Sequence, residues 1–142
     1  MKFFACLFAF SAFTFSAFAH SEVKDEHVAK RMELMSAMAA QTKLLGGMMK
    51  KQIEFDALKA NAALSSIAEL AAATPEAFET QATDPKSEAK AIIWEEFEAF
   101  TKLAEELEAK AEGANIEAHE DIKGAMMAIG ASCKACHSEY RE

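Results

Sequence analysis

Apolar residues recur at steps of three and four along four separate stretches of the chain, and this spacing limits the fold more than any other feature. Such steps place side chains on one face of an α-helix. Residues that favour strands are scarce, because valine occurs only at Val23 and Val28, whereas alanine occurs 31 times. With 142 residues, of which 51% are hydrophobic, the chain suits one globular domain. An all-α protein is therefore predicted.

The periodicity predicts four helices, over residues 22–51, 56–73, 87–112 and 115–140. Asp56 and Asn115 are the expected N-caps of the second and fourth helices. The stretch 74–87 contains both prolines and is expected to be the one long loop. Four amphipathic helices with two short links and one longer loop predict an antiparallel four-helix bundle.

The inner faces of these helices are predicted from the same spacing. The face of the first helix is expected to consist of Val28, Met32, Met35, Ala39, Thr42 and Met49. The face of the third is expected to consist of Ile93, Phe97, Phe100, Ala104, Leu107 and Ala111. The face of the fourth is expected to consist of Ile122, Met126, Ile129, Cys133, Cys136 and Tyr140.

The first nineteen residues have the pattern of a secretory signal peptide. A positive start at Lys2 precedes an uncharged stretch, residues 3–19, that holds seven of the eleven phenylalanines and ends in Ala17-Phe18-Ala19. A retained membrane anchor is the alternative, but seventeen residues are at the lower limit for spanning a bilayer. We therefore expect cleavage after Ala19, a bundle domain over residues 20–142, and a location in the periplasm.

Cleavage would remove Lys2 and change the formal net charge from −8 to −9. A chain this acidic is not expected to bind nucleic acid. Without the signal peptide it is also not expected to stay inserted in a membrane. Cleavage would further remove Cys6, so that Cys133 and Cys136 become the only cysteines.

One short motif near the C-terminus carries the chemistry. Cys133-Lys134-Ala135-Cys136-His137 is the Cys-x-x-Cys-His pattern of c-type haem attachment. Two thiols must add to the two vinyl groups of one porphyrin, while the histidine reaches the iron from the same side. On a helix, positions i, i+3 and i+4 lie on one face within about one turn. The motif therefore predicts one covalent haem c, with His137 as a ligand of its iron.

Three other interpretations of the two cysteines are open. A thiol–disulfide oxidoreductase needs its cysteines at a helix N-terminus, where the thiol pKa is lowered, and here they lie near a C-terminus. A closed structural zinc site needs four ligands. His119 lies about 27 Å from His137 along the same helix, so only His20 and His27 remain as further donors. A structural disulfide would close almost no loop and would stabilise the fold little.

Residues beyond the motif resemble the cytochrome c′ family, also called class II c-type cytochromes. The closing segment from Gly130 to Arg141 is similar to the family's closing segment at nearly every recurring position. Ile93-Trp94 with Phe100 resembles its third-helix signature, Phe55-Asp56 the start of its second helix, and Arg31-x-x-x-Met35 its first-helix signature. One departure is Ala91, where the family often has proline.

The resemblance implies an up-down-up-down four-helix bundle with haem in its core, frequently as a homodimer. It implies that Cys133 and Cys136 hold the haem and that His137 is the proximal ligand. It also implies that Arg31 contacts the haem, for example through a propionate, because arginine forms charge-assisted bonds with carboxylates. Arg141 would lie near the proximal face, one turn beyond His137.

The resemblance gives Met35 two alternative roles. In one branch of the family a methionine at this position binds the iron and the protein carries electrons. In the other branch the distal side is open, and nitric oxide or carbon monoxide can bind. We expect ligation by Met35, because a thioether is a flexible ligand and Met/His ligation raises the reduction potential. Met32 and Met38 are expected to pack against neighbouring helices.

The sequence thus predicts a periplasmic electron carrier with one haem c, ligated by His137 and Met35. A five-coordinate protein that binds or sequesters a diatomic gas is the alternative. The expected partners are redox proteins, with a basic patch favoured by the negative charge, and a second copy of the chain. There is no nucleophile–base pair for hydrolysis, so an enzyme is not expected.

Overall fold

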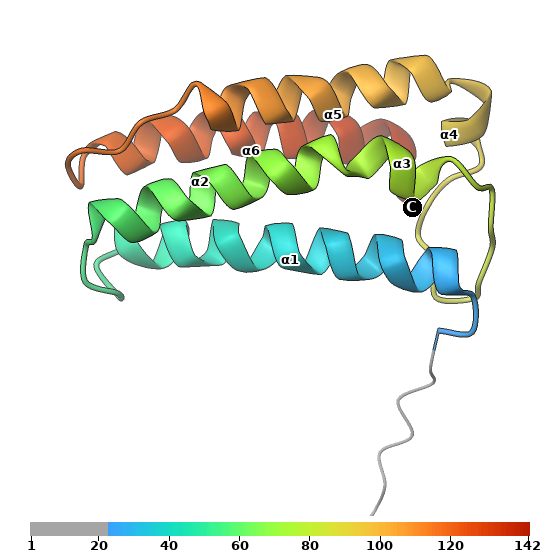
Figure 1. The fold of residues 1–142 in the computed structure, drawn as a ribbon, viewed down its shortest axis with the longest axis horizontal. Helices are drawn as coiled ribbons and strands as arrows, with labels where there is room; N and C mark the ends of the chain where they lie inside the picture. Colours follow the sequence, from blue (N-terminus) through green and yellow to red (C-terminus); the bar gives the residue numbers. More distant parts are fainter. Residues whose placement is uncertain (1–22) are drawn as a thin grey trace, which may run out of the picture.

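A computed structural model describes residues 23–142. Its four long helices are α1 (Glu26–Met49), α2 (Ala57–Ala72), α5 (Phe97–Glu112) and α6 (Asp121–Tyr140). Two short helices, α3 (Thr74–Phe78) and α4 (Ile92–Glu95), lie between α2 and α5. Successive long helices run in opposite directions (Figure 1). The predicted all-α, up-down-up-down bundle is therefore confirmed, whereas the predicted signal peptide lies outside the described residues.

Side-chain caps determine where two of the long helices begin. Asp56 accepts a hydrogen bond from the backbone N–H of Lys59 at 3.0 Å, as its predicted N-cap role requires. Asp25 accepts from the N–H groups of His27 and Val28 at 2.9 and 3.1 Å, so α1 begins a few residues later than expected. Within residues 23–142, no helix is both long and apolar enough to cross a membrane.

The core face of α1 is turned by one residue from the predicted face. Met32 is 41% exposed and Ala39 is exposed, so neither belongs to the core and the predicted packing of Met32 is wrong. One residue is about 100° of helix rotation, which exchanges one face for the next. The rotation buries Arg31, a polar residue that a hydrophobic pattern cannot select. The buried side chains of α1 are Val28, Arg31, Leu34, Met38, Leu45 and Met48.

The remaining apolar faces are closer to the prediction. Ile93 and the α5 residues Phe100, Ala104, Leu107 and Ala111 are buried as expected. Phe78 is also buried, and its ring packs against that of Phe100 at 4.9 Å between centroids. On α6 the core face contains Ile122, Ala125, Ile129, Ser132 and Tyr140.

The third and fourth helices begin later than predicted. Residues 88–90 are extended instead of helical, because the Lys90 N–H donates to the Tyr140 carbonyl at 3.0 Å. Helix α6 begins at Asp121 because the Asp121 carboxylate accepts from the N–H groups of Glu117 and Ala118, which form a turn before the helix. The predicted cap Asn115 instead donates to the Glu117 carboxylate.

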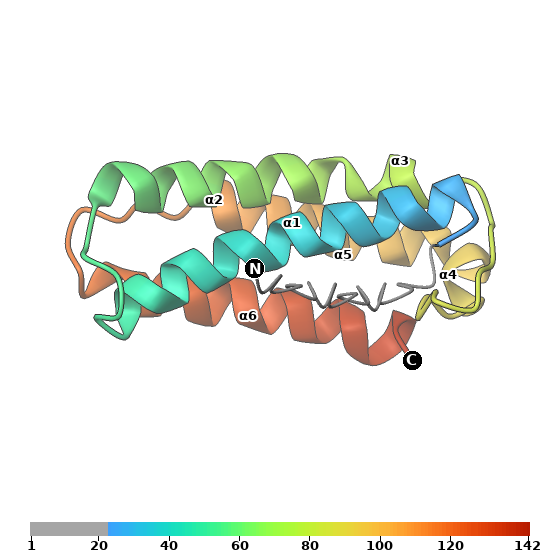
Figure 2. The ribbon, with the colours of Figure 1, turned by 90° about the horizontal axis from the view of Figure 1, so that it is seen from below.

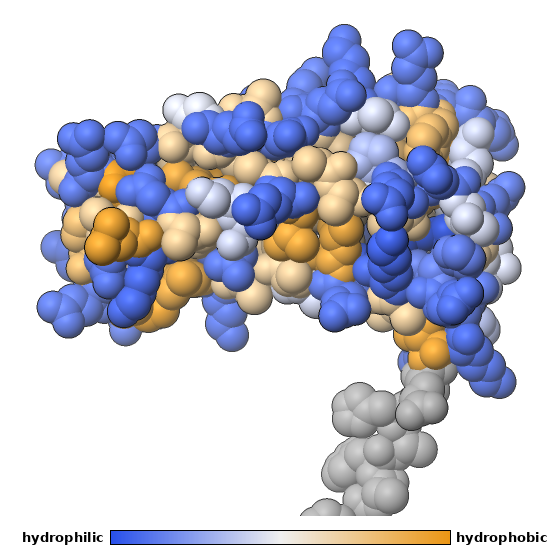
Figure 3. Space-filling view, in the orientation of Figure 1, coloured by the Kyte–Doolittle hydropathy of each residue, from blue (hydrophilic) through white to orange (hydrophobic). Residues whose placement is uncertain are grey.

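The two ends of the bundle differ in how closely α1 and α6 approach each other. Where α1 ends and α6 begins, the His119 Nε2 lies 3.0 Å from the Met48 carbonyl oxygen, and its N–H can donate to it. Toward the other end the two helices diverge (Figure 2). Hydrophilic residues cover much of the face drawn in Figure 3, with apolar residues along its middle. The divergent end carries the residues of the Cys-x-x-Cys-His motif.

Asn61 fastens the link between α5 and α6 to α2. Its amide Nδ2 donates to the Ile116 carbonyl at 2.8 Å, and its Oδ1 accepts from the Ile116 N–H at 3.0 Å. Ile116 is fully buried. Without the amide, a backbone N–H and a carbonyl would lose their partners at a partly buried position.

We therefore expect Asn61→Ala to lower the free energy of unfolding by about 2 kcal/mol. Asn115→Ala is the matched control, because its amide contacts only an exposed carboxylate; a change below about 0.5 kcal/mol is expected. Urea titration followed by far-ultraviolet circular dichroism measures both. Equal effects of the two substitutions would contradict the proposed fastening.

Candidate functional site

The three motif residues lie on the last turns of α6, which is unbroken up to Tyr140. Cys133 and Cys136 are half-buried free thiols that contact the core, and His137 is exposed. Positions 133, 136 and 137 therefore keep the spacing of one helical turn. Two thiols and an imidazole on one turn are the donor set that covalent haem attachment requires.

The electrostatics of the two thiols oppose redox catalysis. Burial raises the pKa of Cys133 above its usual value. Burial, with a smaller contribution from Cys133, raises the pKa of Cys136 to about 11. Both thiols are thus protonated at neutral pH, whereas a thiol–disulfide oxidoreductase needs a lowered thiol pKa. The oxidoreductase interpretation gains no support from this site.

The surroundings of His137 lower its pKa and so favour the neutral imidazole. Desolvation lowers its pKa, the nearby positive charge of Arg141 lowers it further, and Glu88 acts in the opposite direction. A neutral imidazole is the form that binds a metal. In the described part of the chain, no three histidine, cysteine or acidic side chains are grouped so that they could hold a metal ion.

Met35 lies on α1 with its side chain half-buried and packed against the core. Its neighbours Leu34 and Met38 are buried, and the burial of Met38 confirms its expected packing. Two buried apolar side chains of α1 thus lie near Met35, while the buried Arg31 lies about one turn before it. Ligation of iron by Met35 stays a prediction.

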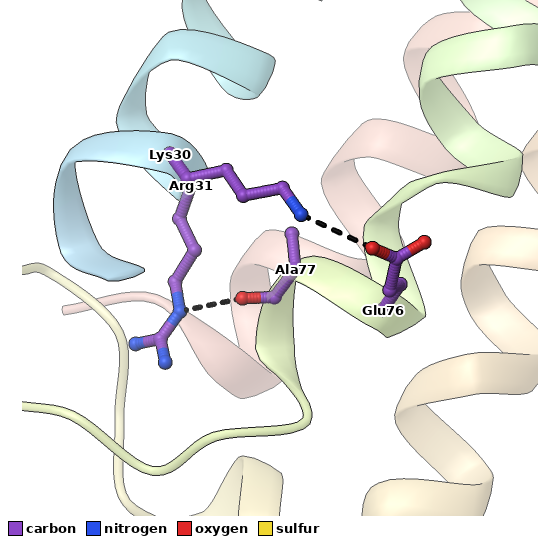
Figure 4. A network of polar contacts seen from close by, with 4 residues as sticks. All are labelled: Lys30, Arg31, Glu76 and Ala77. Carbon is purple, nitrogen blue, oxygen red and sulfur yellow. Dashed lines mark hydrogen bonds and ion pairs between the residues drawn. The ribbon is translucent and has the colours of Figure 1, made fainter. Parts of the chain in front are cut away.

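Arg31 is 3% exposed and donates to three backbone carbonyls (Figure 4 shows the first of these bonds). Its Nε donates to Ala77 at 3.0 Å, its Nη1 to Ala82 at 3.3 Å, and its Nη2 to Thr80. The guanidinium also lies 4.8 Å from the ring centre of Phe78 and 5.1 Å from that of Trp94. Arg31 therefore organises the chain that follows α3. Its predicted contact with haem stays a prediction.

Arg141 follows the last turn of α6 and pairs with Glu88. Its Nε donates to the Glu88 carboxylate, and the two side chains form an ion pair. Its backbone N–H donates to the His137 carbonyl at 3.2 Å. Arg141 is thus linked to the predicted proximal ligand through the backbone and through its charge.

The hydrophobic pattern did not indicate the residues that support the end of α6. The Lys90 Nζ donates to the carbonyls of Glu139 and Ser138 at 3.1 and 3.4 Å, and these belong to the last turn. The Tyr140 hydroxyl donates to Glu96 at 3.3 Å. The family resemblance also extends to the Ala89-Lys90 pair directly before Ala91, and this pair was the one available signal.

Comparison with known proteins identifies the family. The model of the cytochrome c′ family matches residues 26–141. Cytochrome c-554 of Cereibacter sphaeroides is 36% identical over 121 residues, which cover 79% of this chain and 90% of that protein. Cytochrome c′ of Rhodospirillum rubrum is 32% identical over 141 residues, which cover 94% and 93%. This chain therefore belongs to the cytochrome c′ family.

Solved structures agree with this assignment. A structural model of oxidised cytochrome c556 from R. palustris matches with a TM-score of 0.76 and 27% identity, over 82% of this chain and 96% of that one. Cytochrome c′ from Rhodopseudomonas palustris matches with a TM-score of 0.74 and 26% identity, over 84% and 98%. As a member of this family, with a Cys-x-x-Cys-His motif near the C-terminus, the chain binds a covalent haem c.

The buried contacts of Arg31 predict a large effect of its removal. Arg31→Met would leave three carbonyls without their donor, and we expect the free energy of unfolding to fall by about 3 kcal/mol. Lys30→Met is the matched control, because Lys30 makes only an exposed ion pair with Glu76 (Figure 4), which is worth at most about 1 kcal/mol. Guanidinium chloride titration distinguishes them, and a small loss for Arg31→Met would contradict this role.

Proposed function

We propose that this chain is an exported haem c protein whose iron has His137 as its one strong protein ligand. The opposite side of the haem is then open to a small diatomic gas, such as nitric oxide or carbon monoxide. The observation that carries this proposal is the match to the cytochrome c′ family over residues 26–141. When bound, the haem supplies a redox-active iron with a free coordination position.

Different residues of the chain would attach the haem, bind its iron and line its open side. Cys133 and Cys136 would hold the haem through two thioether bonds from one helical turn. His137 would bind the iron as a neutral imidazole, which its lowered pKa favours. On α1 the buried side chains of Leu34 and Met38 flank Met35. An apolar surrounding of this kind favours a neutral diatomic molecule over an anion, because a charged group is costly to desolvate.

Electron transfer is the second candidate function. Met35 favours electron transfer, because its side chain on α1 is partly buried and packs against the core. Ligation by methionine and histidine together would raise the reduction potential. Redox partner proteins and a homodimer belong to both candidates as further expectations. The periplasm is the compartment proposed for either, because the predicted signal peptide precedes the bundle.

Covalent attachment predicts a mass change that depends on both cysteines. Expressed with a cytochrome c maturation system, the exported protein should be coloured, and its mass should exceed that of the cleaved polypeptide by one haem. Replacing both Cys133 and Cys136 by serine should abolish this difference, whereas Ser132→Ala should keep it. A colourless wild-type protein with the mass of bare polypeptide would refute the haem assignment.

Carbon monoxide separates the two candidate functions. If the distal side is open, the ferrous wild-type protein should have a high-spin spectrum that shifts completely on adding the gas, and Met35→Leu should bind it similarly. If Met35 ligates the iron, the wild-type spectrum should be low-spin and resist the gas. In that case Met35→Leu should bind the gas readily, and the electron carrier would replace the gas-binding proposal.

A further inference from the structure

Residues 79–91, which join α3 to α4, connect the two helices that diverge at the motif end of the bundle. We refer to this segment as the crossbar. Its first part contacts the beginning of α1, and its last part contacts the end of α6. In Figures 1 and 2 it runs across the end of the bundle where these two termini lie.

The contact with α1 is made by Asp84. Its Oδ2 accepts from the backbone N–H groups of Lys24 and Asp25, at 2.9 and 3.4 Å. Arg31, nearly two turns further along α1, donates to the carbonyls of Thr80 and Ala82 in the crossbar. The crossbar thus binds backbone donors just before α1 and a side-chain donor within it.

The contact with α6 is made by Glu88 and Lys90. The Glu142 N–H donates to the Glu88 carbonyl at 2.9 Å, and the Lys90 N–H donates to the Tyr140 carbonyl at 3.0 Å. The Lys90 ammonium caps carbonyls of the last turn of α6, where a positive charge is also favourable to the helix dipole. Glu88 pairs with Arg141.

The piece between these two contacts is short and ordered by its own bonds. Four residue steps separate Asp84 from Glu88, and they can span at most about 14 Å. The Ser87 N–H donates to the Asp84 carbonyl at 2.9 Å, and the Lys86 N–H donates to the Asp84 carboxylate at 2.9 Å. Pro85 further restricts the backbone. The turn and the proline therefore stiffen the crossbar between its contacts with α1 and α6.

We propose that the crossbar holds α1 away from the last turns of α6 and so keeps Met35 from binding the haem iron. This inference rests on the proposed function, because it assumes an open distal side. Met35 lies on the helix held by Asp84 and Arg31, and His137 lies on the helix held by Glu88 and Lys90. Loosening the crossbar lets α1 approach α6, and the Met35 thioether then competes with an added gas.

The test is a comparison of two double variants of the haem-loaded protein. Glu88→Gln with Lys90→Met removes the charge that pairs with Arg141 and the bonds from the Lys90 ammonium to the last turn of α6. Glu79→Gln with Lys86→Met changes the same charges in the same segment, but these side chains form no polar contact in the described chain. Both pairs are made in wild type and in Met35→Leu, and the association rate of carbon monoxide with the ferrous protein is measured by flash photolysis.

We expect the Glu88/Lys90 variant to bind carbon monoxide roughly tenfold more slowly than wild type and to gain a low-spin absorption band. In Met35→Leu the same change should alter the rate less than about twofold, as should the Glu79/Lys86 control in either background. An unchanged rate in the Met35 background would overturn the proposal. An equal change in Met35→Leu would also overturn it, because the effect would then be general loosening.

A second pair of variants covers the case in which the first does not fold. Asp84→Ala removes the acceptor for α1, whereas Asp84→Asn retains a carbonyl oxygen; only Asp84→Ala should slow the binding of carbon monoxide. Equal rates for both would overturn the proposal. The wild-type spectrum separately tests the proposed function. If the wild-type spectrum is already low-spin, the gas-binding function and the proposed role of the crossbar both fail. If wild type binds carbon monoxide and the crossbar variants show no change that depends on Met35, only the role of the crossbar is refuted.

Discussion

The proposed attachment of one porphyrin requires two thiols and one imidazole on one turn of one helix, and this requirement is the main constraint on the bundle. Helix α6 supplies all three groups near its C-terminal end. A haem attached there needs space between α6 and the facing helix α1, although the two helices share a core at the other end. The two helices meet tightly at the opposite end, through His119 and Met48, and diverge toward the motif (Figure 2).

Polar bonds to backbone atoms fix both ends of the bundle, and each end uses a different device. At the closed end Asn61 binds the buried Ile116 backbone from α2. At the divergent end the buried Arg31 guanidinium donates to carbonyls of the crossbar, and the Asp84 carboxylate of the crossbar accepts from N–H groups just before α1. The second device fits a region where apolar contact between α1 and α6 is reduced, because directional bonds do not require close helix packing.

The fold could be predicted from the sequence because helical spacing and caps are local properties. The α5 face and the Asp56 cap were correct for this reason. The face of α1 was misplaced by one residue, because burial of Arg31 depends on carbonyls about fifty positions away. The starts of the third and fourth helices were also wrong, since pairing with Tyr140 and the Asp121 turn decides them. The Cys-x-x-Cys-His motif is local and could be recognised from the sequence, whereas the distant residues that bond the end of α6, Lys90 and Glu96, could not.

The stretch from Asp84 to Glu88 has a consequence for how such proteins diversify. It belongs to a surface connection, where insertions, deletions and exchanges are tolerated far better than in a helix core. Inserting or deleting one residue in this turn would change the spacing between α1 and α6 without replacing any residue proposed to contact the haem. On the proposal above, such a change would decide whether Met35 binds the iron, so gas binding and electron transfer would differ in this loop while the residues at the site stay the same.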